Sequence, residues 1–150
     1  MKTNQLSITF FFLLLFLSSC GDSMENERSG KDFLRNEWKV LSVINEDKRF
    51  TAPIKSTFRE EAYILKFVDD SCFKLATSVN YGGGKYQFTS DNYVIISDYI
   101  STLVYNELDA QRNFDDQLLS VFNGLMHYTY KGNKLIFRGE NSKEVVFLKQ

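Results

Sequence analysis

The chain is poor in the residues from which catalytic and metal sites are most often built. Its 150 residues include one histidine, one proline and two cysteines. A Ser–His–Asp triad or a histidine–carboxylate metal set would have to use His127. The alternation around His127 places it on the polar side of a strand, where we expect an ordinary exposed residue. We therefore predict no enzyme activity, no catalytic residue, no metal site and no cofactor.

The sequence also lacks an excess of charge of one sign. It has 18 Lys and Arg against 19 Asp and Glu, a formal net charge of −1. Nucleic-acid-binding surfaces need a basic excess, so we expect no nucleic-acid partner. Tyr128 and Tyr130 are spaced like a strip of base-stacking residues, but without phosphate partners we expect them to pack against the core.

Three consecutive glycines, Gly82 to Gly84, stand before Lys85. A phosphate-binding loop of the Walker type would need glycine at position 79 and serine or threonine at position 86. Val79 and Tyr86 occupy these positions, which excludes this motif. We instead expect the glycines to let the chain bend tightly between two strands, with positive φ angles.

Long apolar runs are missing except near the start of the chain. The run from Ile8 to Leu17 is about half the roughly 20 residues of a membrane-spanning helix and suits a secretory signal. The following Leu17-Ser18-Ser19-Cys20 resembles a bacterial lipobox. This resemblance implies that residues 1–19 are a cleaved signal peptide and that Cys20 becomes lipidated. The alternative is an ordinary cleaved signal with a cysteine there by chance.

Lipidation of Cys20 would attach the protein to a membrane without a spanning segment. Residues 20–33 then form the lipidated cysteine and a polar, flexible tether. The acidic residues Asp22, Glu25 and Glu27 resemble the surface-export signals of Bacteroidetes lipoproteins. We expect an outer-membrane lipoprotein of the cell envelope, on the periplasmic face or at the cell surface.

With Cys20 lipidated, Cys72 is the single remaining cysteine, and no intramolecular disulfide can form. We expect Cys72 to be a small, half-buried residue at the start of a strand. Residues 34–150 have the length of one domain, and their aromatic side chains favour strands packed on a core. Alternating apolar residues predict strands over residues 38–44, 63–68, 73–77, 85–88, 93–97, 100–105, 128–137 (as a hairpin) and 144–148.

The hairpin can be given a register. A two-residue turn at Gly132-Asn133 would place Tyr130 opposite Leu135 and Tyr128 opposite Phe137, on one face.

One segment has the period of a helix instead. Its apolar residues are Phe114, Leu118, Val121, Phe122 and Leu125. We expect Asn113 to be the N-cap, Asp115 and Asp116 to lie in the first turn, and Gly124 to mark the end.

Together these elements predict a mainly β fold with one helix (α+β). About eight antiparallel strands would form a curled sheet or partly open barrel wrapped around the helix. The pattern over residues 34–150 resembles the META domain of heat-inducible lipoproteins of Gram-negative bacteria. The residues that carry the resemblance are Trp38, Asn80, Gly84, Tyr86, Thr102, Phe114 and Leu118. The family implies the same sheet curled around one helix. It often has cysteines at the place of Val79 and shortly after the threonine, and both are missing here.

We therefore expect a lipid-anchored, non-catalytic binding module that contacts an envelope protein, in the envelope or its stress response. The alternative is a lipocalin-like carrier of a small apolar ligand. A helix inside the sheet would fill the space that such a ligand needs, so a small ligand is not expected in that case.

Overall fold

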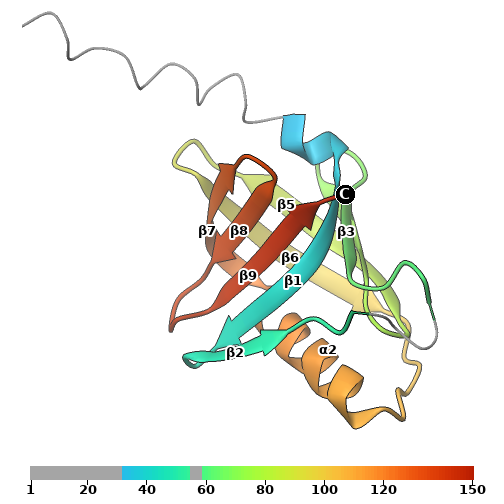
Figure 1. Ribbon diagram of the computed structural model, residues 1–150. Coiled ribbons are helices and arrows are strands. Elements are labelled where there is room, and N and C mark those ends of the chain that lie inside the picture. Colours follow the sequence, from blue (N-terminus) through green and yellow to red (C-terminus); the bar gives the residue numbers. More distant parts are fainter. Residues whose placement is uncertain (1–31, 55–58) are drawn as a thin grey trace, which may run out of the picture. The chain divides into compact units, whose positions relative to one another are not determined.

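Antiparallel pairing joins all the strands of the structure into one sheet that closes on itself (Figure 1). The computed structural model describes residues 32–54 and 59–150. Its strands are β1 (Glu37–Asn45), β2 (Lys48–Thr51), β3 (Ile64–Phe67), β4 (Cys72–Ala76), β5 (Tyr81–Phe88), β6 (Tyr93–Ser101), β7 (Gly124–Lys131), β8 (Lys134–Arg138) and β9 (Glu144–Lys149). The order is β2-β1-β3-β4-β5-β6-β7-β8-β9, and β1 also pairs with β9. This second pairing closes an eight-stranded barrel and leaves β2 as an extra strand.

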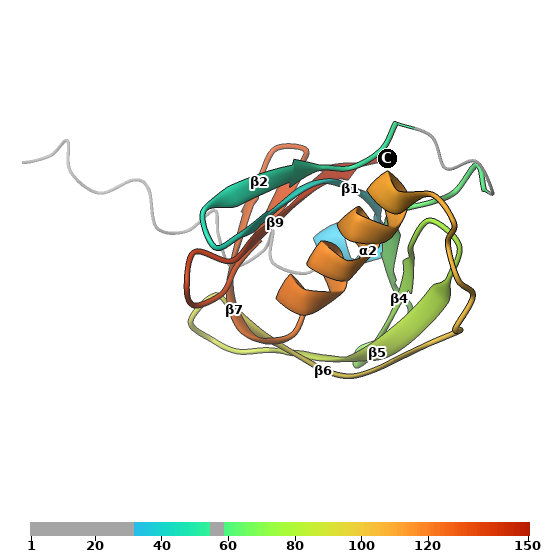
Figure 2. The same cartoon turned by 90° about the horizontal axis from the view of Figure 1, so that it is seen from below.

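The helix α2 (Asp109–Val121) lies across one open end of this barrel (Figures 1 and 2). Phe114, Leu118 and Val121 are buried on its inner face and belong to the same core cluster as the strand residues. The expected fold class, a mainly β fold with an antiparallel curled sheet and a single helix, is confirmed, and the helix covers one end of the barrel. The family-pattern residues Phe114 and Leu118 are thus core residues.

The other end of the barrel is filled by aromatic rings around Phe33 of the short 3-10 helix η1 (Asp32–Arg35). The centroid of the Phe33 ring lies 5.4 Å from the ring centroid of Phe88 and 5.5 Å from that of Tyr130. The indole Nε1 of Trp38 donates a hydrogen bond of 2.9 Å to the Phe33 carbonyl, which anchors η1. Complete burial of a Phe side chain is worth about 1.5–3 kcal/mol, so this contact helps to hold the end closed.

Most of the expected strands are confirmed. In the last hairpin, Tyr130 pairs with Leu135 and Tyr128 with Phe137, as predicted. Cys72 begins β4 and is half-buried, also as predicted. The expected strands over 93–97 and 100–105 are one strand, β6, which ends at Ser101. The β2 strand was not predicted, because its sequence is charged and mostly exposed.

The predicted start of the helix is wrong. The helix begins at Asp109, and the side-chain Oδ1 of Asn106 accepts a hydrogen bond from the Leu108 amide just before it. Asn113 is therefore inside the helix and is not its N-cap. Asp115 and Asp116 also lie inside the helix and not in its first turn. The first helical turn carries polar residues, so the apolar period becomes visible only later in the sequence.

The predicted end of the helix is partly wrong. Gly124 follows it closely, with a φ of 82°, but already begins β7. Leu125 lies in that strand, not on the helix, and its side chain is 56% exposed.

The expected bend at the glycine run is also wrong. Gly82, Gly83 and Gly84 lie inside β5, and the described glycines with positive φ are Gly124 and Gly132. Glycine is needed at these positions because neighbouring atoms leave no room for a Cβ. A Cβ on Gly83 would lie 2.8 Å from the Phe73 carbonyl oxygen, which is closer than real Cβ contacts. Such close approach of neighbouring backbones is a recognised reason for glycine in a strand.

The family-pattern residue Gly84 gives a test of this explanation. A Cβ there would lie 2.6 Å from the Ser97 carbonyl oxygen and 2.9 Å from the Phe73 ring. We expect Gly84→Ala to lower the free energy of unfolding by about 1–3 kcal/mol, as overpacking does.

The matched control is Gly139→Ala, where the nearest atom would be the Lys143 Cβ at an ordinary 3.5 Å. This variant should change stability by less than about 1 kcal/mol, with a small gain from the stiffer unfolded chain. Urea unfolding followed by Trp38 fluorescence measures the free energy of unfolding of both variants. Equal effects at the two glycines would contradict the explanation.

Candidate functional site

Exposed apolar side chains gather where the chain leaves β6 and crosses to α2. The β6–α2 loop spans residues 102–108, at the helix end of the barrel (Figure 1). Leu103 is 96% exposed, Tyr105 71% and Val104 56%, while Ile100 at the end of β6 is 78% exposed. We call these four residues the loop surface. Contiguous exposed apolar groups of this kind often mark a binding surface.

Two hollows border the loop surface. The smaller, here called the loop groove, has a volume of about 340 Å³ and lies between the β6–α2 loop, the β4–β5 turn and α2. Its lining includes Val79, Leu103, Val104, Asp115, Asp116 and Leu119. The larger, about 1340 Å³, lies over β4, β5 and β6, with Cys72 and the three glycines among its lining residues.

The side chain of Asn80 holds the β6–α2 loop to the β4–β5 turn. Its Oδ1 accepts hydrogen bonds from the Val104 amide at 2.7 Å and from the Thr102 hydroxyl at 2.8 Å. Its Nδ2 donates to the Val104 carbonyl at 2.9 Å. The amide group therefore binds the loop backbone much as a neighbouring strand would. Asn80 and Thr102, two residues of the family pattern, are here in direct contact.

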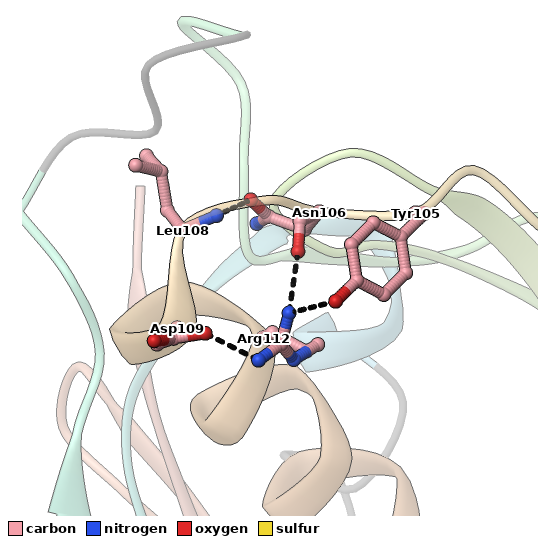
Figure 3. A network of polar contacts seen from close by, with 5 residues as sticks. All are labelled: Tyr105, Asn106, Leu108, Asp109 and Arg112. Atoms are coloured by element: carbon pink, nitrogen blue, oxygen red, sulfur yellow. Dashed lines mark hydrogen bonds and ion pairs between the residues drawn. The ribbon is translucent and has the colours of Figure 1, made fainter.

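Arg112 of α2 holds the same loop from the other side (Figure 3). Its Nη1 donates to the Tyr105 hydroxyl, and to the Asn106 carbonyl at 3.2 Å. Its Nη2 forms an ion pair with Asp109. The Tyr105 hydroxyl thus bonds to the guanidinium, while most of the side chain stays exposed. The loop is fixed at both ends although it has no strand or helix of its own.

A buried polar cluster lies beneath the loop. Asp115 is only 7% exposed, and it accepts hydrogen bonds from the Ser78 hydroxyl and, at 3.3 Å, from the Ser78 amide. Asn106 donates to the Ser78 hydroxyl at 2.6 Å and to the Gln111 side chain at 3.2 Å. The cluster connects the helix, the β4–β5 turn and the loop.

Burial has a strong electrostatic effect in this cluster. Burial raises the pKa of Asp115 above its usual value, and the hydrogen bonds from Ser78 oppose this only in part. Burial also raises the pKa of Tyr63, and the negative charge of Asp115 adds to this effect. The loop groove therefore has a carboxyl group in its wall that is costly to ionise.

The other residues singled out from the sequence lie away from the loop groove. Trp38 is fully buried, and Tyr86 is nearly so, with its hydroxyl donating to the Asp69 carbonyl. His127 is half-buried in β7, with its ring 5.2 Å from that of Tyr93. Cys20 lies outside the described residues.

The described part of the chain contains neither a cluster of metal-binding side chains nor a helix that could span a membrane. Within residues 32–54 and 59–150, no group of three or more His, Cys, Asp or Glu could hold a metal ion. No helix in the same ranges is long and apolar enough to cross a membrane.

Sequence reasoning missed Asp115, although a signal was present. Buried positions recur on α2 at Gln111, Phe114, Asp115, Leu118 and Val121, the spacing of the inward stripe of a helix. A carboxylate within that stripe indicates a buried polar contact. The loop surface was missed because Leu103, Val104 and Tyr105 resemble the continuation of a strand.

No family model matches the sequence, and neither does any curated protein. The fold itself is known. It is similar to the NMR structure of a protein from Burkholderia xenovorans, with a TM-score of 0.60 and 11% identity over 77% of this chain and 82% of that one. A second NMR structure is similar with a TM-score of 0.56 and 10% identity, over 77% and 90% of the two chains. At such low sequence identity, the structural similarity shows a shared barrel fold and nothing about function.

Asp115 gives a pH-dependence that can be measured. The pKa of an unfolded Asp is about 3.9, and burial raises the folded-state pKa above it. The contribution of the carboxyl group to stability is therefore complete below about pH 4 and is lost as pH rises through the folded-state pKa. Asp115→Asn cannot ionise, so we expect its stability relative to the wild type to increase from about pH 4 to about pH 7.

Urea unfolding at several pH values measures this difference. Asp116→Asn is the matched control, because it makes the same change at the exposed neighbouring position. If both variants show the same change in stability with pH, burial of Asp115 is not the cause of the pH-dependence.

Proposed function

We propose that the chain is a lipid-anchored protein of the outer membrane whose barrel is a non-catalytic binding module for another envelope protein. The observation that carries the proposal is the position of the loop surface. It lies at the α2 end of the barrel, whereas η1 (Asp32–Arg35), the blue element of Figure 1, lies at the opposite end. An anchor upstream of η1 would therefore attach away from the loop surface and leave that surface open to a partner.

The anchoring itself is supported by the sequence around Cys20. An apolar run, two small residues and a cysteine occur in the order of a lipobox. Attachment to a membrane raises the local concentration of the module next to its partner, so a weak contact can be sufficient. Only one exposed surface of modest size is then needed.

The filled interior of the barrel favours binding on the outside. Phe33 and Trp38 occupy one end, and Phe114, Leu118 and Phe122 occupy the other, all within one buried cluster. A lipocalin-like carrier is the alternative, since the barrel fold is compatible with it, but it would need an open lumen.

We also propose a relation to the META domain. Its support is the contact between Asn80 and Thr102, because these two pattern residues together hold the β6–α2 loop.

Cys20 and Cys72 provide a matched pair of variants for the anchor. We expect the wild-type protein expressed in a Gram-negative host to sediment with membranes and to yield an acylated N-terminal peptide by mass spectrometry. Cys20→Ala should abolish acylation, and Cys72→Ala should retain it. An unmodified Cys20 in the mature wild-type protein would disprove the lipid anchor.

Trp38 allows a test of the carrier alternative, because it is the only tryptophan and lies inside the barrel. A dansyl-labelled fatty acid bound in a lumen would accept energy from Trp38 and would be displaced by unlabelled fatty acid. We expect no displaceable energy transfer. A saturable and displaceable signal would favour the carrier.

A further inference from the structure

The charges that line the loop groove are unbalanced. Asp115 and Asp116 both line it, and among the described residues no Lys or Arg forms an ion pair with either of them. Arg112 also lines the groove, but its guanidinium already contacts Asp109 and Tyr105. The lining residues therefore carry two carboxyl groups against one guanidinium, and the exposed carboxyl group, Asp116, has no ion pair.

Most of the surface that lines the groove is apolar, although Thr77, Asn80, Ser101, Thr102 and Asn106 also contribute. Val79 of the β4–β5 turn, Leu103 and Val104 of the loop, and Leu119 of α2 contribute to the lining. Its volume of about 340 Å³ is at the lower limit of ligand pockets, which run from about 300 to 1,000 Å³. The groove has room for one long side chain more readily than for a large cofactor.

Apolar surface beside the unpaired carboxylate of Asp116 is complementary to one kind of side chain. Lysine and arginine have an apolar stem that packs along such walls and a cationic end that binds carboxylates. A cation next to Asp115 would also offset the cost of burying its charge. An anionic group would instead meet two carboxylates and an arginine that is already paired.

We infer that the loop groove takes a lysine or arginine side chain from an apolar segment of a protein partner. The inference depends on the proposed function, since it names the chemistry of the partner of that binding module. A protein segment fits better than a free amine, because Ile100, Leu103 and Tyr105 beside the groove expose apolar surface that a small amine would leave uncovered. Apolar residues next to the lysine or arginine in the partner segment would cover this exposed surface.

Three capped pentapeptides provide the test: acetyl-Gly-Leu-Lys-Leu-Gly-amide and the two versions with Glu or Gln in place of Lys. Each is titrated into the ¹⁵N-labelled protein (residues 20–150), and the amide chemical shifts are followed by NMR. We expect the Lys peptide to cause saturable shifts at residues 77–80, 102–106 and 115–119. The Gln peptide should bind more weakly at the same place, and the Glu peptide more weakly still.

Variants separate a specific contact from general attraction to acidic protein. Asp116→Asn should weaken binding of the Lys peptide by about two- to five-fold, as expected for a partly exposed ion pair. Leu103→Ser should weaken all three peptides. Asp98→Asn makes the same charge change at a residue that pairs with Lys85 outside the loop groove, and should leave affinity unchanged.

The outcomes distinguish this inference from the function on which it depends. Equal binding of the Gln and Lys peptides, or equal effects of Asp116→Asn and Asp98→Asn, would overturn the preference for a cation and leave the binding module in place. A photo-crosslinker at position 103 in intact cells tests the module itself. If it forms no adduct with any protein, the binding module is overturned together with the inference.

Discussion

The pairing of β1 with β9 is the interaction on which the rest of the structure depends. It turns a sheet with two edges into a barrel, so that backbone groups which would be exposed at an edge are paired. A closed barrel of eight strands has an interior that side chains can fill, but its two ends stay open. Protein interiors pack as densely as organic crystals. Each open end of the barrel must therefore be covered by further side chains or by another element. The ring cluster around Phe33 closes one end, and α2 closes the other.

The candidate site exists because α2 closes one end of the barrel. A helix that lies across a barrel end presents one face to the core, and its flanks meet the turns between the strands. Asp115 meets Ser78 at this boundary, where a carboxylate can be buried only if donors surround it. The chain must also travel from β6 to the start of α2, which leaves residues 102–108 without a regular ladder. Asn80 and Arg112 replace that ladder with side-chain hydrogen bonds, so an exposed apolar loop is held in a defined place.

The elements that could be predicted from the sequence are those whose signal is local. Alternation located the strands, and the two-residue turn at Gly132-Asn133 set the register of the last hairpin. The start of α2 could not be predicted in this way, because its first turn is polar and is preceded by a contact from Asn106. The role of the glycines also depends on residues of the two neighbouring strands, Phe73, Ser97 and Tyr99, whose positions are set by strand pairing. Of the site, Asn80 and Thr102 were identified as pattern residues, but their contact is a tertiary feature.

The glycine run then connects packing inside the barrel with the surface outside it. Inside, the missing Cβ atoms of Gly82 and Gly84 leave room for the rings of Tyr99 and Phe73, which stack with centroids 6.2 Å apart. Outside, the three glycines of β5 line the larger hollow, together with Ile100 of β6. The loop groove begins just beyond, at Ser101 and Thr102, which line both hollows. The end of β6 and the first residue of the loop therefore border both hollows, whereas the interior is filled by core side chains.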